Sequence, residues 1–417
     1  GGDITLDGAR LGAYEGNIEL ASVASPLSIG LDISGNTFSL NIPTDVERGD
    51  ISLANESYIS VIGAGEGNLV INARNLEISN SFIYAGIGVN SDNPNAQAGN
   101  INLNATESIS LKDGAVIDNG VYSQGNAGDI YLKASNTISL VNSNIYNNIE
   151  AGGIGNGGNI NITAGSLSLT DGSQIQAILN SVDAENNLAG GQVNAGDINI
   201  NVSDAITISG IKNGFSSSIF SLVNTGAVGN AGDININTGS LFLAEGSEIN
   251  SKTLGQGSAG NITINARQTI YLDGSGEVTL ADGSSGTIFT RIINSVDPGA
   301  VGNAGDIQLN TGTLSASNGA FISSGTVGKG NTGNIAINAS DTVSFDTNSY
   351  ASSEVLSNSV AKAGDIRVKT GNLSLTNGSQ LSTNVLGSGN AGNIFVEARD
   401  SVTLDGVNGN AISGIQS

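Results

Sequence analysis

A three-residue phrase, Gly followed by Asp or Asn and then by Ile or Leu, recurs along the whole chain and limits its possible folds more than any other feature. After Gly67 it returns mostly at intervals of about thirty residues, a period typical of solenoid proteins built from one repeated unit. We therefore expect a stack of similar units. The phrase begins at Gly2, Gly16, Gly49, Gly67, Gly99, Gly128, Gly158, Gly196, Gly232, Gly260, Gly305, Gly333, Gly364 and Gly392.

Each unit contains three short apolar segments separated by Gly, Ser, Asn and Asp. In the unit that begins at Gly232, apolar residues lie two positions apart in the first segment (Ile234–Ile236) and again in the second (Leu241–Leu243). The third segment is weaker and begins near Ile249. A period of two with many β-branched residues indicates strands with one face inward, and no part of the sequence has a sustained helical period.

Three strands per unit, repeated in one direction, predict an all-β fold, namely a parallel β-helix of about a dozen coils in which equivalent strands lie about 4.8 Å apart. Helices that cover a parallel sheet would need amphipathic segments between the strands, and there are none. Although 417 residues could form several domains, an array is one elongated body whose units touch mainly their neighbours. We divide it into less regular coils at residues 1–66 and a regular array at residues 67–417.

From Gly158 onward two unit types alternate. One has Thr-Gly or Ala-Gly before its second segment, as at Thr238-Gly239, and the other has a longer polar turn, as at Asn265–Gln268. We expect the glycines to occupy corners that require positive φ. Insertions, which are either surface elaboration or places of recognition, are expected between a third strand and the next motif. They are Asn180–Val193, Asn213–Val228, Gly274–Val301 and Phe345–Lys362.

The acidic composition limits the partners of the chain. Asp and Glu number 37 against 14 Lys and Arg, for a net charge of −23. Nucleic-acid binding needs Lys and Arg to neutralise phosphates, and anionic membrane surfaces would repel the chain. No apolar run is long enough for a membrane span. Neither end has the atypical unit that usually caps a solenoid, so we expect a piece of a longer protein.

Five phrases carry a resemblance to a known family: Gly16–Leu20 (GNIEL), Arg48–Leu53 (RGDISL), Ile71–Ser79 (INARNLEIS), Gly229–Ile234 (GNAGDI) and Thr238–Ser247 (TGSLFLAEGS). The chain resembles the filamentous-haemagglutinin-like exoproteins of two-partner secretion systems, particularly large cyanobacterial members. The resemblance covers essentially the whole chain, with residues 1–66 resembling the region just after the secretion domain, which is absent here. It implies a right-handed β-helix, export through an outer-membrane transporter, and an extracellular or outer-cell-surface location.

The polar residues of the motif have structural interpretations. The recurrence of Asp beside Gly is compatible with calcium binding, but Asn takes the same position in other units and the calcium-binding nonapeptide is absent, so no calcium site is predicted. We interpret these residues as turn formers that bond their own backbone. Asparagines two residues before the motif Gly should form a hydrogen-bonded ladder. They are Asn126, Asn156, Asn194, Asn230, Asn303, Asn331 and Asn390.

Catalysis is not expected, and no cofactor or metal is assigned. Glycoside hydrolysis needs two carboxylates at one site, whereas Asp and Glu are expected to be scattered and solvated. The chain has no His, which excludes Ser-His and metal-His sites. The recurrence of Arg74, Arg267 and Arg399 at one turn position indicates an architectural role. A β-helical polysaccharide lyase or hydrolase remains the alternative.

Four aromatic residues are the candidate contact surface: Tyr131, Phe242, Tyr271 and Phe395, each between two inward apolar residues. Phe242 and Tyr271 should stack about 4.8 Å apart in neighbouring coils. They either stiffen the sheet or lie under an insertion, or they contact a glycan or another rod. We therefore expect a secreted, non-catalytic rod with a structural or adhesive role, which binds cell-surface glycans or copies of itself.

Overall fold

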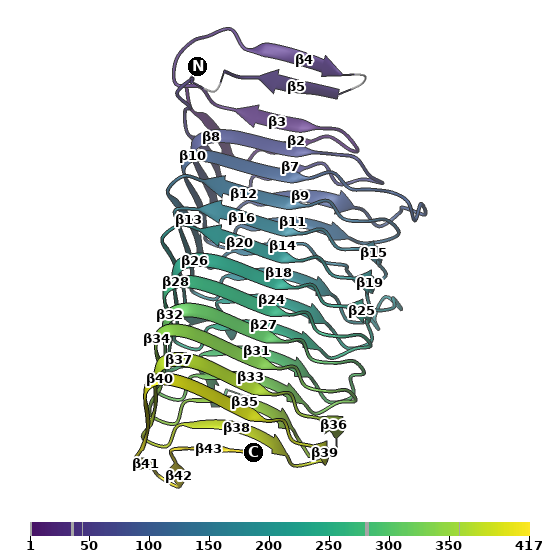
Figure 1. Ribbon diagram of the computed structural model, residues 1–417. Helices are drawn as coiled ribbons and strands as arrows, with labels where there is room; N and C mark the ends of the chain where they lie inside the picture. The colour runs from purple at the N-terminus through teal and green to yellow at the C-terminus, as the bar shows by residue number, and fades with distance from the viewer. Residues whose placement is uncertain (1, 35–36, 44, 280–282, 358) are drawn as a thin grey trace.

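In the computed structural model, which describes residues 2–34, 37–43, 45–279, 283–357 and 359–417, all regular elements of these residues are β-strands. The units are stacked one upon another from the N-terminus to the C-terminus (Figure 1). The expected all-β class is confirmed. A search of the described residues finds no helix long and apolar enough to cross a membrane.

Strands pair in parallel with the equivalent strands of the preceding and following units. β26 (Ile234–Ala244) pairs with β20 (Ile198–Val202) and β21 (Ala205–Ser209) on one side and with β28 (Ile262–Asp273) on the other. Ile198, Ile234 and Ile262 stand in register. Because the paired strands come from different units, their hydrogen bonds run along the length of the stack.

The first and second apolar segments of the units together form a 17-stranded sheet, which we call the first sheet. Its strands are β1 (Ile4–Asp7), β3 (Ile18–Ala21), β6 (Ile51–Ala54), β8 (Leu69–Ser79), β10 (Ile101–Lys112), β12 (Ile130–Ala134), β13 (Thr137–Val141), β16 (Ile160–Ala164), β17 (Ser166–Thr170), β20, β21, β26, β28, β32 (Ile307–Ser317), β34 (Ile335–Phe345), β37 (Ile366–Thr376) and β40 (Ile394–Asp405).

The third segments form a 13-stranded parallel sheet, which we call the second sheet. Its strands are β2 (Arg10–Gly12), β7 (Tyr58–Ser60), β9 (Phe82–Ile87), β11 (Val116–Val121), β14 (Asn144–Tyr146), β18 (Gln174–Leu179), β24 (Ser218–Val223), β27 (Glu248–Thr253), β31 (Arg291–Val296), β33 (Phe321–Thr326), β35 (Tyr350–Val355), β38 (Gln380–Val385) and β43 (Gly414–Gln416).

The remaining strands lie at the corners. Short parallel pairings join β15 (Ile154–Asn156), β19 (Gln192–Asn194) and β25 (Val228–Asn230), and also β36 (Val360–Lys362) and β39 (Ser388–Asn390). Four antiparallel hairpins complete the structure: β4 (Gly30–Ser34) with β5 (Thr37–Asn41), β22 (Ile211–Lys212) with β23 (Phe215–Ser216), β29 (Ser275–Thr279) with β30 (Ser285–Phe289), and β41 (Val407–Asn408) with β42 (Ala411–Ile412).

The first two segments, which we expected to be separate strands, run together as one strand in many units, as in β26 and β28. Their register shifts at the junction, where Thr238 pairs with Ala266 but Ser240 pairs with Thr269. The longer polar turn therefore bulges out against the shorter Thr-Gly corner. This bulge is the structural basis of the two alternating unit types.

The inward side chains form one continuous aliphatic core. Ile160, Ile234 and Ile335 are completely buried, as the alternating pattern predicts. Burying an aliphatic side chain of this size stabilises a protein by about 1.5–3 kcal/mol. A smaller cluster that includes Ile87, Val121 and Ile149 lies at the C-terminal ends of the third segments.

The motif glycines are required for a reason other than the one we expected. Gly232 and Gly260 do not have positive φ. Instead, a Cβ on Gly232 would lie 2.0 Å from the carbonyl oxygen of Gly196, and a Cβ on Gly260 would lie 2.1 Å from that of Gly232. The motif is therefore a column of close backbone contacts that leaves no room for a side chain. The expectation of positive φ was wrong for these positions, and also for the corner glycines Gly165, Gly239, Gly312 and Gly371.

Two motifs near the N-terminus mark a different segment from the others. Gly49 precedes β6, whose Ile51 pairs with Leu76 in the second half of β8, and β1 pairs with β6. Gly2 and Gly49 therefore begin second segments, whereas Gly16 begins a first segment. The β4–β5 hairpin, which follows β3 in the chain, lies beyond β3 at the N-terminal end of the stack (Figure 1). The division of the chain at residue 66 stays a prediction.

Three of the expected insertions are wrong, because each contains a third strand whose polar residues hide its apolar pattern. β24, β31 and β35 lie within 213–228, 274–301 and 345–362, of which residues 280–282 and 358 lie outside the described part. Between the second and third segments, and not after the third, stand the hairpins β22–β23 and β29–β30. The sequence around Asn180–Val193 does contain a loop, closed by an antiparallel bridge between Asp183 and Leu188.

Candidate functional site

The four predicted aromatic residues lie on the outer face of the first sheet but do not form one surface. Tyr131 and Phe395 belong to first segments of distant units, and Phe242 and Tyr271 to neighbouring second segments. Phe242 and Tyr271 make a tilted pair with ring centroids 6.4 Å apart, not the flat stack expected. Tyr131 donates a hydrogen bond to Asp129, 2.7 Å long, and the guanidinium of Arg367 lies 4.6 Å from the ring centre of Phe395. Their role in binding stays a prediction.

The Asp and Asn residues of the motif form a ladder along the stack. The backbone N–H of Asn261 donates to Oδ1 of Asp233 at 2.7 Å, and that of Asp233 donates to Oδ1 of Asp197 at 2.8 Å. The interpretation as turn formers that bond their own backbone was therefore wrong. The ladder extends with the same bond through Asn17, Asn68, Asn100, Asp129, Asn159, Asp197, Asp233, Asn261, Asp306, Asn334, Asp365 and Asn393.

The asparagine ladder predicted two residues before the motif Gly is confirmed in part. Side-chain amides bond from Asn156 to Asn126 at 3.0 Å and from Asn230 to Asn194 at 3.1 Å. Between Asn230 and Asn303 the chain places Ser258, whose backbone N–H bonds to Asn230. The side-chain ladder is therefore interrupted where Ser258 takes the place of Asn.

A second set of amide ladders runs up the outer face of the first segments. The Nδ2 atoms of Asn237, Asn265, Asn310 and Asn338 each donate to the Oδ1 of the asparagine one unit earlier, at 2.7–2.9 Å, beginning from Asn201. These asparagines alternate with buried residues, so their side chains line the outside of the sheet. The amides are held in one orientation by their neighbours, which orders a polar surface.

One carboxylate of the second sheet is buried and another, in the following unit, is half-buried, contrary to the expectation that Asp and Glu are solvated. Asp118 of β11 is 4% exposed and stands in register between Tyr84 and Tyr146. The hydroxyl of Tyr122 donates to Oδ2 of Asp118 at 2.8 Å. In the next unit, Glu150 accepts a hydrogen bond from Asn148 at 3.2 Å.

Burial perturbs the ionisation of this cluster. It raises the pKa of the Asp118 carboxyl to about 7, the hydrogen bond from Tyr122 opposes the rise, and the charge of Glu150 adds to it. Burial also raises the pKa of Glu150, against hydrogen bonds from Asn148 and Asn180. Carboxyl groups whose pKa values are raised by burial are a feature of catalytic sites, although ion-pair networks also perturb pKa values.

A cavity of about 310 Å³ adjoins this cluster. It is lined mainly by apolar side chains, among them Tyr14, Ile62, Val89 and Tyr122, with Ser91 as a polar member. Tyr122 therefore lines the cavity and also bonds to Asp118. Such a combination of an apolar pocket with a few polar groups is the usual form of a small-molecule site.

Sequence reasoning missed Asp118 and Glu150 because they look like isolated acidic residues between apolar ones. The available signal was the alignment of units, which places Asp118 at the position held by Tyr84 and Tyr146. A carboxylate between two large aromatic side chains is poorly hydrated.

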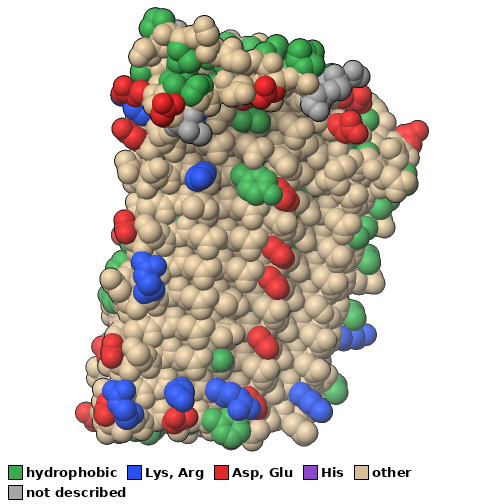
Figure 2. Space-filling view, turned by 45° about the horizontal axis from the view of Figure 1, so that its top comes forward, with side chains coloured by type: hydrophobic (Ala, Val, Ile, Leu, Met, Phe, Trp, Pro, Cys, Tyr) green, Lys and Arg blue, Asp and Glu red, His purple; other side chains and the backbone are tan. Residues whose placement is uncertain are grey.

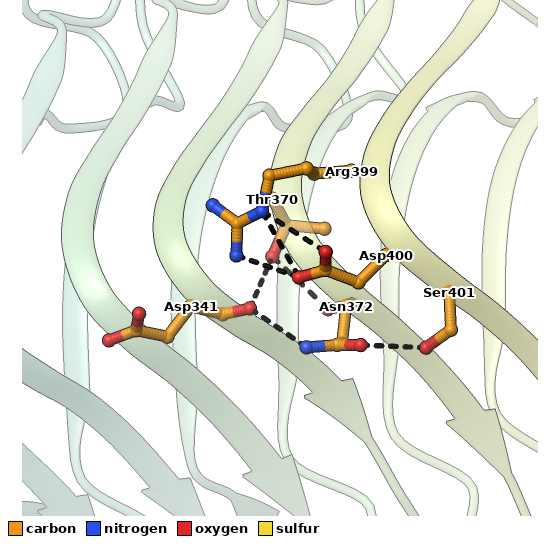
Figure 3. Close-up of polar contacts among 6 residues, drawn as sticks. All are labelled: Asp341, Thr370, Asn372, Arg399, Asp400 and Ser401. Carbon is orange, nitrogen blue, oxygen red and sulfur yellow. Dashed lines mark hydrogen bonds and ion pairs between the residues drawn. The ribbon is translucent and has the colours of Figure 1, made fainter.

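The corner between the first and second segments is occupied by structural contacts (Figure 3). Arg399 bonds its neighbour Asp400 through Nε and through an Nη atom at 2.7 Å, and Asn372 donates from its amide to the carbonyl oxygen of Asp341. Arg74 likewise pairs with Asp50 at 2.7 Å, and Arg267 bonds the carbonyl of Ser203. Arg74 and Arg267 therefore join different units, in agreement with the architectural role expected of them, whereas for Arg399, which pairs with its neighbour in the chain, that role stays a prediction.

No group of three or more His, Cys, Asp or Glu side chains in the described residues could hold a metal ion. No protein-family model, curated protein or solved structure matches this chain.

Proposed function

We propose that the chain is a right-handed parallel β-helix, with three short strands per coil, that acts outside the cell as a structural or adhesive rod. The parallel register between units and the continuous aliphatic core support this architecture. The finer features, three strands per coil and right-handedness, rest on the three-segment repeat and on the resemblance to filamentous-haemagglutinin-like exoproteins.

The observation that carries the proposal is the motif ladder from Asn17 to Asn393. Each link joins a side chain of one unit to the backbone of the next, in addition to the sheet hydrogen bonds. Deforming the rod would therefore break side-chain and backbone bonds together. A body of this kind suits a stiff spacer that presents its lateral faces to a partner.

The resemblance also supports a cellular setting. We propose export through the outer-membrane transporter of a two-partner pair and residence at or beyond the outer cell surface. The partners there would be cell-surface glycans or other copies of the chain.

The proposal is tested with the purified chain in two measurements. Electron microscopy should show straight, elongated particles, and the chain should be retained on cells or immobilised glycans without altering the glycan. Globular particles would contradict the rod, and failure to bind cells, glycans or itself would contradict the adhesive role.

A second candidate function, a carbohydrate-active enzyme, is favoured by one observation: the buried Asp118, whose pKa is raised partly by the charge of the half-buried Glu150, bonds to Tyr122 at the edge of the cavity. Glycoside hydrolysis uses one protonated and one ionised carboxyl group. Release of reducing sugar or unsaturated products from polysaccharides would support it, provided that Asp118→Asn and Glu150→Gln abolish the activity. The exposed Glu185 gives the matched control, since Glu185→Gln should leave any such activity unchanged.

A further inference from the structure

The outer face of the first segments contains a broad region without charge. Over six successive units, from β16 to β34, both outward positions of the first segment are uncharged. Those residues are Asn161, Thr163, Asn199, Asn201, Asn235, Asn237, Thr263, Asn265, Gln308, Asn310, Ala336 and Asn338. We call this region the amide face.

Charged residues lie at the borders of the amide face. Lys133 precedes it along the stack, and Arg367 and Lys369 follow it, in register with its two columns. The acidic members of the motif ladder, such as Asp233, run beside it, each one residue before a first segment. Figure 2 shows a broad surface area of this kind, free of charged and hydrophobic side chains over most of its extent and bordered by both signs of charge.

We propose that the amide face docks the same face of a second copy of this chain. The chain carries a net charge of −23, so two copies repel each other wherever their carboxylates meet. On the amide face they can approach without bringing carboxylates together. An uncharged face therefore reduces electrostatic repulsion most when the partner is a second, equally acidic copy of the chain.

The chemistry of the amide face is self-complementary. An asparagine amide has two N–H donors and an oxygen with two lone pairs. In the ladder, Asn265 donates one side-chain N–H to Asn237 and accepts a hydrogen bond from Asn310. One N–H donor and one lone pair of Asn265 therefore stay available for a facing amide. Sheets that carry stacked Asn side chains in register pair in this way in steric zippers, where the facing side chains interdigitate.

The size of the amide face sets the strength of the contact. Six units at about 4.8 Å, with five-residue segments at about 3.3 Å per residue, give roughly 450 Å² per copy. The total of about 900 Å² is below the 1,200–2,000 Å² typical of stable complexes. The association should therefore be weak and concentration-dependent, and it would become significant where many copies are held at one surface. This inference rests on the proposed function only in that the associating body is the rod.

Sedimentation velocity over a concentration series tests the proposal. The wild-type chain should form dimers as its concentration rises to several hundred micromolar, and more readily in high salt, which screens the repulsion elsewhere. Asn237→Asp with Asn310→Asp adds two charges to the amide face and should abolish the dimer. Asn95→Asp with Asn187→Asp adds the same charge at exposed loop positions and should leave it intact.

Crosslinking gives an independent readout, because the chain has no Cys. Thr263→Cys, on the amide face, should form a disulfide-linked dimer under mild oxidation, whereas Thr207→Cys, at an exposed second-segment position, should not. A wild-type chain that stays monomeric, or equal crosslinking of the two variants, would overturn the amide-face proposal. Neither result would affect glycan or cell binding by monomeric rods, so the proposed function would fail separately.

Discussion

The hydroxyl of Tyr122 donates a hydrogen bond to the carboxylate of Asp118 at 2.8 Å on a sheet face where Asp118 is only 4% exposed. Because a carboxylate in such surroundings is poorly hydrated, its neutral form is favoured. The pair therefore connects the stability of the second sheet with pH.

Asp118→Asn should remove a pH dependence of stability. The pKa of Asp118 is raised from 3.8 to about 7 in the folded chain. Ionising the buried carboxyl group therefore lowers the free energy of unfolding. This cost is absent below about pH 4, grows as the pH rises and is complete above about pH 7, where it is on the order of 4 kcal/mol. In thermal melts between pH 5 and 8.5, the gain in stability of the variant over the wild type should increase up to about pH 7 and then stay constant. Glu185→Gln is the control, and an equal gain at every pH would contradict the assignment.

Tyr122→Phe should act in the opposite direction. Its hydroxyl stabilises the charged form of Asp118, so its loss raises the pKa of Asp118 further. Hydrogen bonds to charged groups contribute about 1.5–3 kcal/mol, and the loss of stability should approach this amount at pH 8.5 and be smaller at pH 5. Denaturant unfolding at both values measures the difference. The same loss at both would show that the hydroxyl serves packing alone.

Gly232→Ala should destabilise the chain severely. The added Cβ would lie 2.0 Å from the carbonyl oxygen of Gly196, which is backbone and cannot move aside without separating the two units. We expect a loss above about 3 kcal/mol or failure to fold. Gly325 offers a matched control in the second sheet, since a Cβ there would meet only the carbonyl of Glu354 at 3.7 Å. Urea unfolding of the two variants should separate them clearly, and equal stabilities would contradict the close-contact explanation.

The alternation of apolar residues at Ile234 and Ile236 was sufficient to predict strands, an inward face and stacking of units, because it reports a property of each strand by itself. The close contacts of Gly232 could not be predicted in this way, since they depend on how near two units approach. The burial of Asp118 likewise depends on side chains about thirty residues away in each direction. Local patterns therefore predicted the core, whereas the columns that join units required the structure.

The order of Asp and Asn in the motif ladder leads to a last prediction. Asp233 follows Asp197 directly, so two carboxylates stand one unit apart, whereas Asp306 lies between Asn261 and Asn334. Asp233→Asn keeps the acceptor for Asn261 and removes a like-charge contact, while Asp306→Asn removes none. Because the two carboxylates are partly exposed and one unit apart, Asp233→Asn should raise the free energy of unfolding by about 0.5–1 kcal/mol in low salt.

Chemical denaturation at pH 7 should therefore show that Asp233→Asn is more stable than the wild type and that Asp306→Asn is not. The gain should shrink in 1 M salt, where the Debye length falls to about 3 Å. Asp233→Ala should lose stability in both conditions, because it leaves the N–H of Asn261 without its acceptor. A gain that persists in high salt, or one shared by Asp306→Asn, would show that repulsion between Asp197 and Asp233 is not its cause.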